Sequence, residues 1–252
     1  AICNTRLFRT GAGTPPNPAA SYTVDGTTQS PTNLDYRYSD MENWEGDLIV
    51  SRSGDLELLP SGTATWTNSW WTGSTQLNQT ALTTSIYIPL KTIFNGSLLV
   101  GDNRYVHQIV RNDQGINVVN YRRLILPPEY RVRKILSSLS RAWILTNNLY
   151  SGEAAVFEWN GSDDNYSPPS PYFLKDRNVL SGVISDDVLY VLNGAGQILR
   201  IAEGQSGMSE YARLPVFNGG LMKDGTDSNL ITWAAANADN FPVQPNGMDV
   251  VG

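Results

Sequence analysis

The chain has 252 residues, of which 40% are hydrophobic and 17% charged, and its formal net charge is −6. An acidic chain with so few charges has no general attraction to nucleic acid or to anionic lipid, because both depend on an excess of Lys and Arg. No apolar run approaches the ~20 residues that span a bilayer, and the single cysteine, Cys3, excludes an intrachain disulfide.

The N-terminal segment predicts a pair of short strands followed by a long loop. Ala1–Thr5 leads directly into Arg6–Phe8, and we expect Cys3 to lie in a buried strand, where cysteine acts as a small hydrophobic residue. The segment from Gly11 to Ser39 contains the proline-rich stretch Thr14–Pro18, which cannot enter the interior of a sheet. Long loops on a rigid scaffold often carry function, so this segment is a candidate binding region.

Farther along, a short apolar cluster followed by a polar or glycine turn recurs, which is the signature of a β-hairpin. The clear copies are Leu48–Val50, Leu98–Val100, Trp143–Leu145 and Leu189–Val191. Their central residues are separated by 50, 45 and 46 positions, and weaker copies at Ile2 and at Leu230–Thr232 bring the number to six. A period of about 40–50 residues is typical of the four-stranded blades of a propeller.

Strand-like leader segments precede the clear copies. One ends at Trp44, and others span Lys91–Phe94 and Val179–Ile184. The first copy lacks a leader, whereas the chain ends in a leader, Met248–Val251, with no copy after it. Pairing the two ends would complete a blade and remove the open edges of the fold. The sequence therefore predicts an all-β fold, a six-bladed β-propeller closed by pairing of the N- and C-terminal strands.

We expect residues 1–252 to form a single propeller domain of a protein that is processed or longer, because the chain does not begin with Met. One segment, Arg131 to Leu145, has apolar spacing that also fits a helix. The repeat spacing instead places two strands there, and we follow the repeat.

The aromatic residues Trp66, Trp70 and Trp71 form a cluster separated by Asn, Ser and Thr. Adjacent residues on a strand point to opposite faces, so Trp70 and Trp71 are both buried only where both faces of the sheet are covered. Packing between blades provides such cover and favours a core role. The alternative is an exposed aromatic platform that stacks on sugar rings or anchors a partner protein.

A basic segment is the only concentration of positive charge on this acidic chain. It contains Arg122, Arg123, Arg131 and Arg133. Such a segment could pair with an acidic partner subunit or a nucleic-acid backbone, and the alternative is an ordinary charged rim. Together with the three tryptophans, these arginines are the candidate ligand- or partner-binding residues.

Few catalytic chemistries fit the sequence. The single histidine, His107, lies on the polar side of an alternating strand, where we expect it to be solvated, and no Gly-x-Ser-x-Gly motif accompanies it. One His and one Cys cannot form a structural zinc tetrad. Phosphate-binding glycine loops are missing, and the oxygen-rich segment Ser162–Asn165 does not have EF-hand spacing. We expect no catalytic residue, no metal and no cofactor.

Carboxylates alone suffice for glycoside hydrolysis, so they remain the one open catalytic alternative. The candidates lie in or beside predicted turns and are Asp47, Asp102, Asp186, Asp187 and Asp249. Turns favour Asp for local hydrogen bonding in any case, which favours a structural role for them.

The segments Ala155–Gly161 and Leu189–Gly196 resemble blades in the propeller domains of tailed-phage structural proteins, such as tail-hub or nozzle components. The resemblance implies a ring-forming virion part without enzymatic activity. We therefore predict a non-enzymatic structural or interaction propeller in a virion or extracellular assembly. Its expected partners are other protein subunits, including copies of itself in a ring, with no membrane span and no nucleic acid. The alternatives are a carbohydrate-binding module and a carboxylate-dependent glycosidase or lyase.

Overall fold

A computed structural model of the chain describes residues 2–3, 6–9, 23–24, 38–52, 54–63, 66–73, 77–83, 88–151, 153–166, 172–174, 179–193, 196–202 and 207–213. Every regular element in this part of the chain is a β-strand, and every strand pairing is antiparallel. The predicted all-β class is confirmed.

Two three-stranded sheets come from the N-terminal part of the chain. The first contains β1 (Ile2–Cys3), β2 (Arg6–Arg9) and β3 (Thr23–Val24). The second contains β4 (Tyr38–Trp44), β5 (Asp47–Arg52) and β6 (Asp55–Leu59). Glu45 and Gly46, which connect β4 to β5, both have positive φ, as expected of a two-residue hairpin loop whose twist matches that of its strands.

Three four-stranded sheets follow, each with its strands in chain order. One contains β7 (Leu90–Thr92), β8 (Leu98–Asp102), β9 (Tyr105–Arg111) and β10 (Asn117–Ile125). The next contains β11 (Tyr130–Ser137), β12 (Ala142–Asn148), β13 (Ala154–Trp159) and β14 (Tyr172–Leu174). The last contains β15 (Val179–Ser185), β16 (Val188–Asn193), β17 (Gln197–Ala202) and β18 (Ser209–Arg213).

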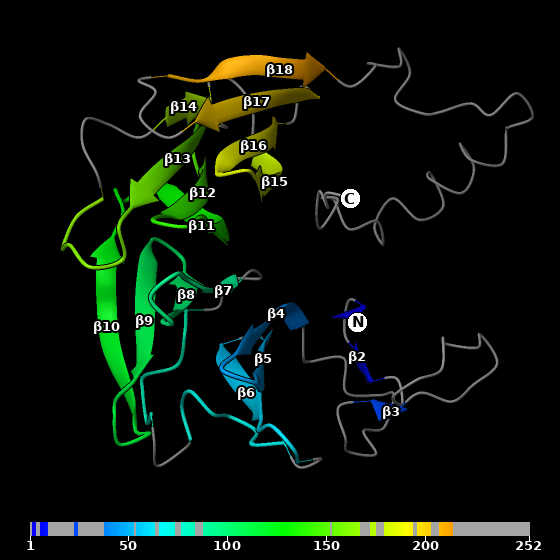
Figure 1. The fold of residues 1–252 in the computed structure, drawn as a ribbon, viewed down its shortest axis with the longest axis vertical. Coiled ribbons are helices and arrows are strands. Elements are labelled where there is room, and N and C mark those ends of the chain that lie inside the picture. Colours follow the sequence, from blue (N-terminus) through cyan, green and yellow to red (C-terminus); the bar gives the residue numbers. More distant parts are fainter. Residues whose placement is uncertain are drawn as a thin grey trace, which may run out of the picture.

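The first strands of consecutive sheets are neighbours in space, because β4 contacts β7, β7 contacts β11 and β11 contacts β15. The last strands, β10 and β18, lie on the outside of the arc that the sheets form (Figure 1). First strands inside and last strands outside are the arrangement of propeller blades. The described part of the chain is therefore propeller-like.

The repeat copies occupy equivalent positions in this arrangement. Each clear copy lies in the second strand of its sheet, namely β5, β8, β12 or β16, and the predicted leaders correspond to β4, β7 and β15. The segment Arg131 to Leu145 contains strands β11 and β12, so the choice of two strands over a helix is confirmed. The copy at Leu230–Thr232 and the final leader at Met248–Val251 lie outside the described residues, so the number of six blades and the closure remain predictions.

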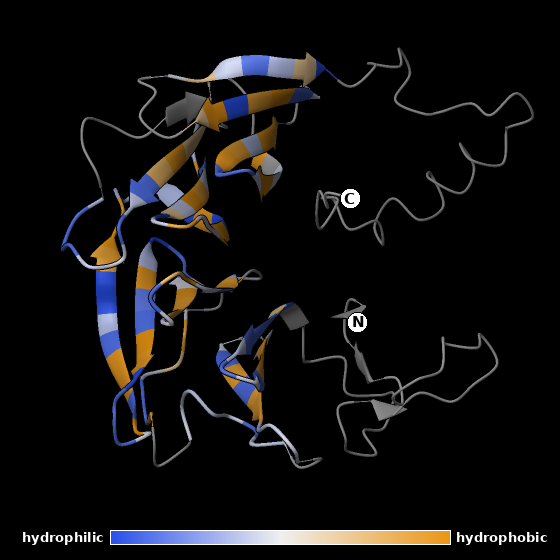
Figure 2. Ribbon diagram, viewed as in Figure 1, coloured by the Kyte–Doolittle hydropathy of each residue, from blue (hydrophilic) through white to orange (hydrophobic). Residues whose placement is uncertain are grey.

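The hydrophobic core lies between neighbouring sheets. One cluster joins the β4–β6 sheet to the β7–β10 sheet, a second joins the latter to the β11–β14 sheet, and a third joins the β11–β14 sheet to the β15–β18 sheet. Both faces of an inner sheet are covered, so β8 and β13 are buried along their whole length, and orange hydrophobic segments continue through the sheets in Figure 2. Strands covered on both faces read as continuous apolar runs instead of alternating ones.

Candidate binding surface on the β7–β10 sheet

Contrary to the expectation of a solvated residue, His107 on β9 is fully buried. The pairing of β10 with β9 shifts register between Asn120 and Leu124, and Arg122 within this bulge has a φ of 52°. The prediction that His107 is solvated was wrong because both faces of the sheet are covered. The polar residues that alternate along β9 therefore point into a second packed layer.

His107 supplies the hydrogen-bond partner that the bulge requires. The backbone N–H of Arg122, displaced from the strand ladder, donates to His107 Nδ1 at 3.0 Å. Because Nδ1 accepts, we assign the ring proton to Nε2, which lies 3.5 Å from Asp102 Oδ2. The hydroxyl of Thr83 donates to the other carboxylate oxygen of Asp102. A single side chain thus satisfies a bulge N–H and faces a buried carboxylate.

Rings extend this network in both directions. Trp71 packs against His107 with ring centroids 5.1 Å apart, and His107 packs against Tyr121 at 4.6 Å. At the surface, the guanidinium carbon of Arg122 lies 4.3 Å from the ring centroid of Tyr105 and 5.2 Å from that of Tyr121. Two of the candidate residues, Trp71 and Arg122, therefore belong to one column that runs from the core to solvent.

The surface end of the column is an arginine–tyrosine cluster, which we define as Arg104, Tyr105, Tyr121 and Arg122. The guanidinium carbon of Arg104 lies 5.1 Å from the Tyr105 centroid. A hydrogen bond from the Arg104 side chain, helped by the charges of Arg104 and Arg122, lowers the pKa of Tyr105 below its usual value. Within the described part of the chain, neither guanidinium forms an ion pair. The cluster is thus a local excess of positive charge on an acidic protein.

The remaining basic residues of the segment have other roles. Arg123 pairs with Asp164 and donates to the carbonyl of Ser162, both in the loop after β13. Arg131 donates to the backbone carbonyls of Pro128 and Tyr130 at 2.6 and 2.8 Å.

Arg133 lies on β11, at the inner edge of its sheet, whereas Arg122 and Arg123 lie on β10, at the outer edge of the preceding sheet. The structure therefore divides the basic segment, and only Arg122 joins the cluster. Arg104 was not among the residues predicted from the sequence. It lies in the turn between β8 and β9, outside the basic segment that contains the other arginines.

The tryptophan cluster forms core and not a platform. Trp70 and Trp71 are both fully buried, so the alternative of an exposed aromatic platform is wrong for these two residues. They lie in turns after β6 and not on a strand, and the carboxylate of Asp55 accepts the backbone N–H of Trp71 at 3.1 Å. Trp66 is half-buried and packs against Val50.

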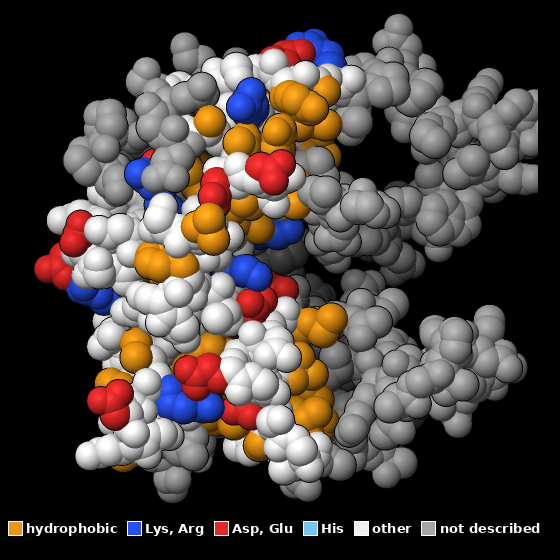
Figure 3. Space-filling model, in the orientation of Figure 1, with side chains coloured by type: hydrophobic (Ala, Val, Ile, Leu, Met, Phe, Trp, Pro, Cys, Tyr) orange, Lys and Arg blue, Asp and Glu red, His pale blue; other side chains and the backbone are white. Residues whose placement is uncertain are grey.

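The outer strand β10 is the second feature of this surface. It is nine residues long and forms the edge of its sheet, and no further described strand lies beside it in Figure 1. Apolar side chains on and next to it are exposed, with 53% of Ile116, 45% of Val118 and 51% of Ile125 accessible to solvent. Elsewhere on the visible face, charges of both signs lie in small groups (Figure 3). An open edge with exposed apolar side chains is a template for pairing with another chain.

The acidic residues that the sequence offered as candidates for glycoside hydrolysis form hydrogen bonds and ion pairs in or beside turns. Asp47 accepts from the backbone N–H of Ser61 and pairs with Arg111 at 2.9 Å, while Asp187 accepts from the N–H of Leu139 at 3.1 Å. Both turn residues Asp186 and Asp187 have positive φ.

Asp47, Asp102 and Asp186 lie in or beside turns of three different sheets, and Asp249 lies outside the described residues. Across the described ranges no group of three His, Cys, Asp or Glu residues is placed to hold a metal ion, and no helix there is long and apolar enough to cross a membrane.

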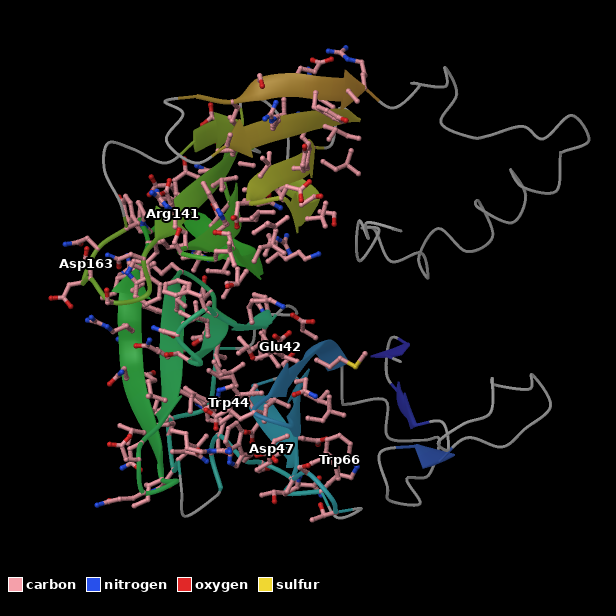
Figure 4. All side chains as sticks on the ribbon, in the orientation of Figure 1. Glu42, Trp44, Asp47, Trp66, Arg141 and Asp163 are labelled. Carbon is pink, nitrogen blue, oxygen red and sulfur yellow. The ribbon has the colours of Figure 1, made fainter. Side chains whose placement is uncertain are left out.

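Two carboxylates on β4 that were not predicted from the sequence form hydrogen bonds to the backbone of β7. Asp40 accepts from the backbone N–H of Leu90 at 2.9 Å, and Glu42 accepts from the N–H of Thr92 at 2.9 Å. Both donors lie on β7, the strand toward which Glu42 points in Figure 4. Burial raises the pKa of Asp40 to about 6, opposed mainly by its backbone hydrogen bonds. The only sequence signal for Asp40 and Glu42 was their alternate spacing in the leader strand before Trp44. Solvated acidic residues have the same spacing, so this signal did not identify them.

Comparisons with known proteins agree with the fold. No family model and no curated protein matches the chain. Among solved structures, the extracellular domain of BT4673 from B. thetaiotaomicron matches over 82% of this chain and 25% of its own, with a TM-score of 0.52 and 12% identity. A streptogramin B lyase matches over 81% of this chain and 62% of its own, with a TM-score of 0.50 and 14% identity.

The chain thus spans about a quarter of the BT4673 domain. Similarity at this level of identity indicates a shared fold and not a shared activity. Neither structure is a phage tail protein, so the phage resemblance gains no support from them.

Proposed function

We propose that this chain is a non-enzymatic interaction domain that joins another protein subunit through the outer edge of its β7–β10 sheet. The observation that carries the proposal is β10, a long edge strand with exposed apolar side chains. Pairing such an edge with a strand of a second subunit satisfies its outward backbone groups and removes Val118 and its apolar neighbours from water. The simplest second subunit is another copy of the chain.

The wider setting of the proposal is a six-bladed, closed propeller in an extracellular or surface assembly. The four sheets with equivalent second strands support the blade count, and the fold shared with an extracellular domain supports the location. A virion setting has no such support. The turn contacts of Asp47, Asp102 and Asp187 support a role without catalysis.

Light scattering on a sizing column tests the proposal. We expect the wild-type chain to form a defined multimer of the 27.7 kDa unit, and Val118→Lys to return it to the monomer, because a buried charge opposes edge pairing. The matched control is Leu139→Lys, which changes an exposed leucine in the turn between β11 and β12 and leaves the multimer intact. A wild-type monomer at the highest soluble concentration, or a multimer that survives Val118→Lys, contradicts the proposal.

A further inference from the structure

The arginine–tyrosine cluster shares strand β10 with the apolar edge through Tyr121 and Arg122, but it has its own chemistry. Arg122 is exposed and Arg104 is half-buried, and both guanidinium groups lie against the ring of Tyr105. Stacking on an aromatic ring holds a guanidinium in place and leaves in-plane N–H donors for a ligand, although Arg104 already uses one donor on the Tyr105 side chain. The Tyr105 ring therefore restricts the motion of the Arg104 and Arg122 guanidinium groups.

Charge favours an anionic ligand at this position. The protein carries a net charge of −6, yet among the described residues no carboxylate pairs with either arginine. Placing two cations together on one ring is unfavourable by itself, because like charges repel. An anion that contacts both relieves this repulsion, whereas neighbouring Arg123 already has Asp164 as its partner.

Spacing indicates the kind of anion. The two guanidinium carbons are separated by no more than the sum of their distances to the Tyr105 centroid, which are 5.1 and 4.3 Å. Side chains at positions i and i+2 of an extended peptide lie on the same face, about 6.6 Å apart. This spacing lies within the upper limit for the separation of the two guanidinium carbons, and each carboxylate can accept two parallel N–H bonds from a guanidinium.

We propose that Arg104 and Arg122 form a binding site for an extended acidic segment of a partner protein, with acidic side chains at alternate positions. The Tyr105 hydroxyl, whose pKa is lowered by a hydrogen bond from the Arg104 side chain, can donate its own proton to a bound carboxylate. Arg104 lies in the turn between β8 and β9, whereas Arg122 lies on β10 within the bulge between Asn120 and Leu124, so the site adjoins the apolar edge. The two proposals are separable because different substitutions and different measurements test them, peptide affinity for the site and multimer mass for the edge.

Fluorescence anisotropy with a labelled peptide of four Thr-Glu repeats tests the site. We expect saturable binding, weakened about tenfold by Arg104→Gln and by Arg122→Gln, because each removes a charged hydrogen-bond pair. Arg213→Gln removes the same charge from β18 and is the matched control, with affinity unchanged. Arg122→Lys keeps the charge but loses the paired N–H geometry, so we expect an intermediate affinity.

Two further measurements separate a binding role from a structural one. Near-ultraviolet circular dichroism verifies that each variant is folded. With carbon-13 labelled tyrosine, bound peptide should raise the pKa of Tyr105, because the carboxylates offset the arginine charges that lower it.

Three outcomes overturn the site: equal binding of a Thr-Gln peptide, unchanged affinity in folded Arg104→Gln and Arg122→Gln, or displacement by sulfate at constant ionic strength, which would indicate a general anion site. Val118→Lys should not change peptide affinity, and the two Gln variants should not change the mass of the multimer.

Discussion

Asp40 should make the stability of the fold depend on pH in a direction unusual for a hydrogen-bonded carboxylate. Burial raises its pKa from 3.8 to about 6, so the folded protein binds a proton there more tightly than the unfolded chain. The stabilisation that Asp40 provides is therefore complete below pH 3.8 and is lost as pH rises through about 6. A shift of about two pH units corresponds to up to about 3 kcal/mol at neutral pH, and solvent contact at this half-buried carboxyl reduces it.

Urea unfolding of the wild type and of Asp40→Asn, at pH 4 and at pH 7.5, isolates this group. The substitution Asp40→Asn removes the titratable carboxyl group and one acceptor oxygen. Asparagine does not titrate, so the loss of that oxygen affects stability equally at both pH values. Glu42 and Lys134, the charged groups that act on Asp40 from β4 and β11, are present in both proteins.

We expect the wild type to lose up to about 3 kcal/mol relative to Asp40→Asn between pH 4 and pH 7.5. Asp113→Asn, in the exposed turn between β9 and β10, should show no such change. A difference between wild type and Asp40→Asn that stays constant with pH, or that moves in favour of the wild type as pH rises, would refute the reasoning.

Two further substitutions test the packing of the β7–β10 sheet. A Cβ at Gly101 would lie 2.7 Å from Pro89 Cγ, so Gly101→Ala should lower the free energy of unfolding by about 1–3 kcal/mol. In the same denaturation assay Gly207→Ala, where nothing lies within 4 Å, should change it little, and equal effects would show that the close approach is absent. His107→Phe keeps a ring but leaves the bulge N–H without its acceptor and leaves the Asp102 carboxylate with Thr83 alone, which should lower stability by about 1–3 kcal/mol. Retained stability, with unchanged hydrogen exchange at the Arg122 amide, would contradict the assigned network.

The strands themselves could be predicted from the sequence. Leu98–Val100 followed by Gly101-Asp102-Asn103 predicts a hairpin because the apolar run and the turn residues are local signals, and β8 and β9 form that hairpin. The repetition of this signal at nearly constant spacing also predicted the equivalent second strands of four sheets. Local propensity and period are enough for these features, since each blade is built mostly from contacts between neighbouring strands.

The environment of individual side chains could not be predicted in the same way. Alternation placed His107 on a polar face, but Trp71, from a turn after the preceding sheet, covers that face. The run of basic residues suggested one patch, but the chain passes from the outer edge of one sheet to the inner edge of the next between Arg123 and Arg131. The arginine that shares the Tyr105 ring with Arg122 is Arg104, which is 18 positions away in the sequence.

The strand order and the period of this protein follow from its sequence, because hydrogen bonding between adjacent strands depends on residues close together in the chain. The identity of the buried polar groups follows instead from the packing of sheets, because burial depends on the neighbouring sheet and not on the strand that carries the group. Asp40 shows the difference most clearly. Its position on β4 follows from the repeat, whereas its raised pKa comes from burial against the next sheet, where the Leu90 N–H on β7 meets its carboxylate.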